Sequence, residues 1–118
     1  MCRRPHGAGF VTWVGVPPAQ FQVNQGVEVL KTYVSSEHGR RQFCSECGSQ
    51  LFCWHVQEGQ ETPDVIDVTL ASLHDPIDRQ PQAHFFYDAK ASWTVVKDDL
   101  PKLGGVDGLQ PLSLQDHR

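Results

Sequence analysis

The chain has 118 residues, of which 39% are hydrophobic and 20% charged, and its formal net charge is −4. These values are typical of one ordinary globular domain and argue against non-specific binding to nucleic acid. No stretch reaches the roughly 18–20 apolar residues of a membrane-spanning helix, so we expect no membrane partner.

Short segments rich in β-branched and aromatic residues predict strands, and turn signals separate them. In chain order, the predicted strands are residues 10–16, 21–23, 27–34, 49–56, 65–73 and 84–88. Loops are expected at 35–40, 57–64 and 74–82, with one helical turn within 89–99. This pattern predicts an all-β antiparallel domain over residues 1–103, followed by a loosely ordered, glycine-rich tail over 104–118.

A C-x-x-C-G motif lies in the sequence "RQFCSECGS" of residues 41–49. In such a turn the sulfurs of Cys44 and Cys47 can point at one ion, and Gly48 permits a left-handed backbone conformation. A redox C-x-x-C normally opens a helix of a βαβ unit, whereas strands are expected on both sides here. The motif therefore predicts a zinc knuckle, with a redox dithiol or simply buried cysteines as the alternatives.

A second pair of ligands, which structural zinc requires, is not visible. Cys2 lies far upstream, and Cys53 lies inside an apolar strand, where a small core residue is expected. Histidines that could contribute a ligand are His6, His38, His55, His74 and His84. None has a diagnostic spacing. The strongest of them is His84, for which a buried histidine with a satisfied hydrogen bond is the favoured interpretation.

Two arginine pairs, residues 3–4 and 40–41, lie within a few residues of a cysteine. Such neighbours favour a thiolate and attract anionic substrates, although solvated surface charge is the ordinary alternative. Cysteines in a chain without a clear export signal predict a reduced, cytoplasmic environment.

Three segments, "CRRPHGAGFVTWVGV", "FCSECGSQLF" and "HFFYDAKASWTVVKDDLPKL", occur in this order across residues 2–103. Together they resemble the glutathione-dependent formaldehyde-activating enzyme family, a group that also includes centromere protein V. The resemblance implies a fold of several short coiled antiparallel sheets, called a β-tent, with one or two zinc ions. It also implies a carbon–sulfur lyase activity that joins formaldehyde to glutathione, giving S-hydroxymethylglutathione.

Carried over residue by residue, the resemblance assigns Cys44 and Cys47 to a structural zinc site and Cys2 to a catalytic zinc ion. It also makes Arg3 the candidate for holding a substrate carboxylate. The family's upstream C-x-C pair and the first two cysteines of its catalytic cluster are absent before Cys2. We therefore expect a domain truncated at its N-terminus, either because Met1 is an internal start or because the gene itself is truncated. Such a domain should bind zinc poorly or with improvised ligands and have little or no activity.

Two other functions stay open at this level. One is a non-enzymatic zinc-fold module that binds a protein or small molecule, which the missing cysteines favour. The other is a secreted or redox protein in which Cys44 and Cys47 form a disulfide. An unpaired sheet edge in a truncated β domain would also favour a homodimer.

Overall fold

The computed structural model describes residues 1–112, and residues 113–118 lie outside the described part. The chain divides into two compact units. Unit 1 comprises Met1–His6 and Val11–Pro76, and unit 2 comprises Gly7–Phe10 and Ile77–Arg118. The end of the predicted tail thus falls outside the described residues, and the division into a domain of residues 1–103 and a tail stays a prediction. No helix in residues 1–112 has the length and apolar character needed to cross a membrane.

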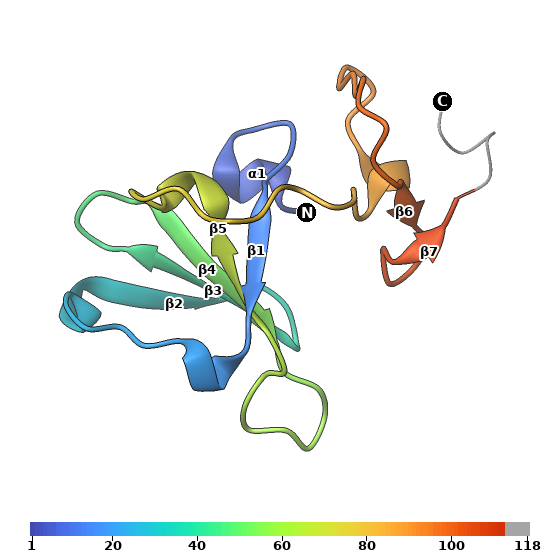
Figure 1. Cartoon of the computed structure of the whole chain (residues 1–118). Helices are drawn as coiled ribbons and strands as arrows, with labels where there is room; N and C mark the ends of the chain where they lie inside the picture. The colour runs from blue at the N-terminus through green and yellow to red at the C-terminus, as the bar shows by residue number, and fades with distance from the viewer. Residues whose placement is uncertain (113–118) are drawn as a thin grey trace. The chain divides into compact units, whose positions relative to one another are not determined.

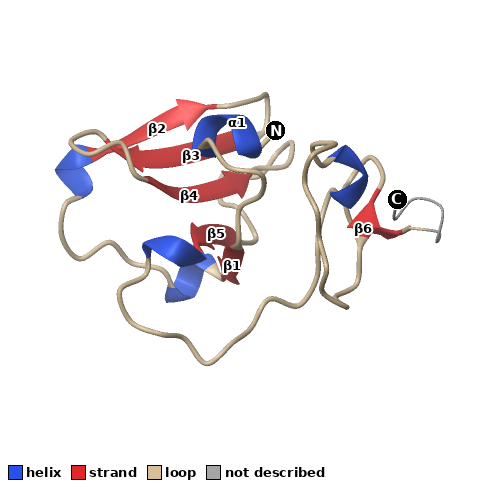
Figure 2. Cartoon of the chain, turned by 90° about the horizontal axis from the view of Figure 1, so that it is seen from above, coloured by secondary structure: helices blue, strands red, loops and turns tan. Residues whose placement is uncertain are grey.

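A five-stranded antiparallel sheet forms unit 1 (Figure 1), with the strand order β1-β5-β4-β3-β2. Its strands are β1 (Trp13–Val16), β2 (Leu30–Val34), β3 (Gly39–Cys44), β4 (Gln50–His55) and β5 (Ile66–Thr69). Short helical segments accompany them: α1 (Arg3–His6), η1 (Pro18–Gln20), η2 (Val27–Val29) and η3 (Leu70–Ser72). The predicted all-β antiparallel class is confirmed, since strands dominate and the helices are single turns (Figure 2).

The two faces of this sheet differ in character because side chains alternate along each strand. Arg41, Cys53 and Asp67 stand in register on three neighbouring strands, so they share one face. Phe52 and Val68 are paired on the opposite face, where Phe21 packs edge-on against Phe52 at a centroid distance of 4.9 Å. The connection from β1 to β2 thus covers the apolar face. The row of Arg41, Cys53 and Asp67 lies on the other face, which carries the candidate site.

The structure corrects several predicted element boundaries. β3 begins at Gly39, inside a predicted loop, because its three polar residues in a row (residues 40–42) hide the strand pattern. Residues 21–23 form no strand, since Phe21 is used for packing on the apolar face. The predicted strand 27–34 starts as the turn η2 before it becomes β2.

Unit 2 holds the single turn η4 (Tyr87–Ala89) and a two-stranded sheet of β6 (Leu103–Gly104) and β7 (Gln110–Pro111). His84 links two segments of this unit through two backbone hydrogen bonds of 2.8 Å. Its amide donates to the Pro101 carbonyl, and its carbonyl accepts from the Leu103 amide. The predicted strand 84–88 is therefore only a bridge at His84 followed by a turn. Tyr87 is buried beneath the ammonium groups of Lys90 and Lys102.

Candidate functional site: two thiol groups on the five-stranded sheet

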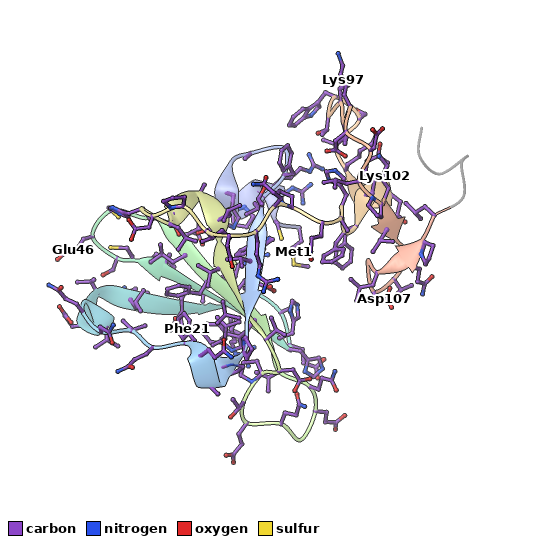
Figure 3. The ribbon with its side chains drawn as sticks, in the orientation of Figure 1. Met1, Phe21, Glu46, Lys97, Lys102 and Asp107 are labelled. Atoms are coloured by element: carbon purple, nitrogen blue, oxygen red, sulfur yellow. The ribbon has the colours of Figure 1, made fainter. Side chains whose placement is uncertain are left out.

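The first group is the hairpin turn between β3 and β4, residues 44–49, which we call the thiol turn. The amide of Cys44 donates to the Ser49 carbonyl at 2.9 Å, and the amide of Gly48 donates to the Cys44 carbonyl at 2.8 Å. Gly48 has a φ of 78°, the left-handed conformation that the sequence predicted for a glycine at this place. Figure 3 shows Glu46 at the tip of the turn, pointing away from the sheet.

The electrostatics of the thiol turn favour a thiolate at Cys47. Its sulfur lies 3.1 Å from the Ser49 hydroxyl. Hydrogen bonds from the Ser49 hydroxyl, then from the Ser49 amide and the Cys44 thiol, hold the pKa of Cys47 below its usual range. The Cys44 sulfur is thus close to that of Cys47, and all four cysteines are free thiols. Thiolates are the form of cysteine that binds metals and attacks electrophiles.

The donor set of the thiol turn can be compared with the needs of zinc. A structural zinc ion takes a closed tetrahedral set of ligands. Cys44 and Cys47 supply half of such a set, but residues 1–112 contain no group of three or more His, Cys, Asp or Glu placed to hold a metal. The residues present do not make a complete zinc site, so the zinc knuckle stays a prediction.

The second group lies where α1 meets β3, and we call its members, Cys2, His6 and Arg41, the Arg41 cluster. Only 5% of the Arg41 surface is exposed. Its Nη2 atom donates to the Cys2 sulfur at 3.4 Å, while its Nη1 atom is buried and has no hydrogen-bond partner among the described residues. Figure 3 labels Met1, the residue that precedes Cys2.

His6 stands one helical turn after Cys2, because its amide donates to the Cys2 carbonyl at 3.3 Å. Its ring packs edge-on against Trp13 at a centroid distance of 5.3 Å, and its buried Nε2 atom has no partner in the described chain. Burial, and then the charge of Arg41, lower the pKa of His6, so the ring is neutral at neutral pH.

Two ionisable neighbours complete this face of the sheet. Cys53 is buried, as the sequence predicted, and burial raises the pKa of its thiol despite the opposing effect of Arg41. Asp67 follows on β5, and burial raises the pKa of its carboxyl, an effect that His55 partly offsets. Both groups are therefore biased towards their neutral forms.

The predicted site residues are thus divided between the two groups. Cys44 and Cys47 come together in the thiol turn, whereas Cys2 belongs to the Arg41 cluster. Arg3 begins α1 half-buried, and its side chain makes no hydrogen bond or ion pair within residues 1–112. The arginine that contacts a cysteine is Arg41. The sequence indicated an arginine near a cysteine through the pair at 40–41, but the cysteine that Arg41 contacts is Cys2, 39 positions away.

His84 and Trp54 have other surroundings. His84 is half-buried and its Nε2 atom lies 2.9 Å from the Asp98 carboxylate, so it has the satisfied hydrogen bond that was the alternative to metal binding. Trp54 lines an open pocket of about 350 Å³ on the apolar face, together with Phe21, Leu30 and Ile66.

Fold and site together define a small antiparallel β protein with two thiol groups, one exposed in a hairpin turn and one beside a buried arginine. A family model described as glutathione-dependent formaldehyde-activating enzyme matches residues 1–89. Comparison with curated proteins and with solved structures gives no match. The chain belongs to the glutathione-dependent formaldehyde-activating enzyme family, as its sequence motifs indicated.

Proposed function

We propose that this protein takes part in the carbon–sulfur chemistry of formaldehyde with a small thiol of the glutathione type. The family match over residues 1–89 is the observation that carries the proposal, since this segment includes both thiol groups. Within it, Cys2 would be a ligand of the catalytic zinc ion, Arg3 would bind a substrate carboxylate, and Cys44 and Cys47 would hold structural zinc. When bound, zinc supplies a Lewis acid that lowers the pKa of a bound thiol.

We expect zinc binding by residues 1–112 to be weak, because the thiol turn offers two sulfurs and no third ligand group. Metal analysis of the purified chain tests this expectation. Wild type should bind substoichiometric zinc that a chelator removes easily, and Cys44→Ser and Cys47→Ser should each abolish it. Cys53→Ser is the matched control, because that buried thiol lies outside the thiol turn. One tightly held zinc ion per chain would contradict the expectation.

Catalysis is tested by following the exchange between free formaldehyde and its glutathione adduct by NMR. With an incomplete ligand set, the chain should accelerate the exchange far less than a family member that has all the family cysteines. An N-terminally extended version that carries the additional C-x-C motifs should restore the acceleration. Equal activity of the two versions would show that the missing cysteines are not needed.

A second candidate function is a non-enzymatic binding module on the same fold. The incomplete donor set favours it, because a module needs the fold rather than a reacting metal. If the extended version binds zinc but still fails to accelerate exchange, this function replaces the enzymatic one. A cytoplasmic location accompanies both functions as a proposal.

A homodimer is a further part of the proposal. β2 lies at one edge of the sheet, and the side chains of Tyr33 and Val34 on it are exposed. An edge strand with free backbone groups can pair with a second copy. Light scattering of wild type and of Val34→Lys measures this, since a lysine on the edge should produce a monomer if β2 forms the interface.

A further inference from the structure

The apolar face of unit 1 carries an open pocket of about 350 Å³ that takes no part in the proposed function. The sheet contributes Gln42, Trp54 and Ile66 to its lining, one residue from each of three neighbouring strands. Each of them is the chain neighbour of a residue in the row that includes Arg41. Because successive side chains of a strand point to opposite faces, the pocket and the Arg41 cluster lie on opposite sides of the sheet.

Two segments outside the strands complete the lining. The connection from β1 to β2 contributes Phe21, which Figure 3 labels and which is fixed by its edge-on packing against Phe52. The loop between β4 and β5, residues 57–64, contributes Glu61. The side chain of Gln60 lies within hydrogen-bond distance of both ends of this loop, so the loop has a defined shape. The pocket thus combines apolar walls with a carboxylate on an ordered, exposed loop.

The charge around the pocket is negative. Glu61 is the charged side chain of the lining, and it forms no ion pair with any residue of 1–112. The segments that bound the pocket contain one acidic residue in 17–29 and three in 57–64, and no basic one. Arg40 pairs with Trp54 on this face, but its Nη1 atom donates to backbone carbonyl groups of residues 36, 37 and 39. An occupant with a positive charge would therefore complement the pocket.

We propose that this pocket binds a small apolar amine in its cationic form, with the apolar body against Phe21, Trp54 and Ile66 and the ammonium group beside Glu61. The volume of about 350 Å³ is near the lower end of the range for ligand sites, roughly 300–1,000 Å³, and suits one ring with a short arm. An ammonium group is also attracted to the face of an indole ring. The Nε2 atom of Gln42 donates to Thr32 at 3.0 Å, which leaves the amide oxygen to accept from the ligand.

The test is an NMR titration of the ¹⁵N-labelled full chain at neutral pH with 2-phenylethylamine, which is cationic there. The indole N–H signal of Trp54 should shift and saturate, with a Kd that is about millimolar for a ligand of this size. Trp13, on the opposite face of the sheet, and Trp93, in unit 2, are internal controls whose signals should not move. The neutral 2-phenylethanol, of the same size, should bind about fivefold more weakly, because it lacks the charge.

Glu61→Gln should reduce this preference for the amine to about twofold. Glu58→Gln is the matched control, since it removes the same charge from the same loop at an exposed residue outside the lining, and it should leave the preference unchanged. Equal binding of the amine and the alcohol to wild type, equal effects of the two variants, or no saturable shift of Trp54 would overturn the proposal. The assay contains neither zinc nor glutathione, so its outcome is independent of the proposed function.

Discussion

The Nη2 atom of Arg41 lies 3.4 Å from the sulfur of Cys2, which joins the middle of β3 to the residue that precedes α1. This contact connects the first of the three family segments to a residue two positions before the second, and it buries a cation on the polar face of the sheet. Because the arginine has no carboxylate partner in the described chain, its burial is expected to cost the fold stability. Four predictions follow from the contacts on the sheet and in unit 2.

Replacing Arg41 by methionine should raise the free energy of unfolding by about 1 kcal/mol, because it removes a buried charge with unmade hydrogen bonds at similar volume. Urea denaturation of wild type, Arg41→Met and Arg40→Met measures this. The Arg40 control should stay within about 0.5 kcal/mol of wild type. A clear loss of stability in Arg41→Met would mean that the guanidinium is structural.

Thr69→Val should lower the free energy of unfolding by about 1–2 kcal/mol. Thr69 is buried at the end of β5, and its hydroxyl lies 3.0 Å from the Gln50 carbonyl and 2.8 Å from the Ser72 hydroxyl. Valine has the same shape but leaves these groups without their partner. Thr62→Val, at an exposed position, is the control, and an equal effect of both variants would refute the importance of the buried hydroxyl.

Asp67→Asn should stabilise the protein at neutral pH, and the gain should disappear under acid conditions. Burial raises the pKa of Asp67, so the folded protein holds this proton more tightly than the unfolded chain does. The charged carboxylate therefore costs stability above the folded pKa, whereas below the ordinary value of 3.8 both states are protonated. Thermal melting of both proteins against pH measures this, with the exposed Asp75→Asn as control. A constant difference at all pH values would contradict the explanation.

Asp98→Asn should destabilise unit 2, with the opposite dependence on pH. The hydrogen bond from His84 is the main cause of the lowered pKa of Asp98. A carboxyl group whose pKa is lowered by folding stabilises the folded state at pH values above its unfolded pKa of 3.8. This stabilisation is lost as the pH falls through the folded pKa. Hydrogen exchange of the Leu103 amide, which donates to the His84 carbonyl, reports on the unit. Faster exchange in Asp98→Asn than in the neighbouring Asp99→Asn at neutral pH is expected, and equal rates would refute the role of the pair.

Local patterns explain which predictions from the sequence succeed. The strands β1, β4 and β5 were predicted because Trp13, Phe52 and Val68 lie in short runs of β-branched and aromatic residues. The tight turn at Gly48 was predicted because only the local backbone is involved. β3 was missed because its inward-facing residues include Arg41, and no apolar alternation indicates a strand there.

The sequence by itself determined the family, the all-β class and the thiol turn, since these depend on residue types at short spacings. Only the tertiary structure decided that Cys2 lies on Arg41 rather than beside Cys44 and Cys47, and that His84 is bonded to Asp98. The physical reason is that these contacts join residues far apart in the chain. The position of α1 brings Cys2 to Arg41 on β3, and the pairing of the His84 backbone with Pro101 and Leu103 accompanies the contact of His84 with Asp98; no short-range pattern encodes either.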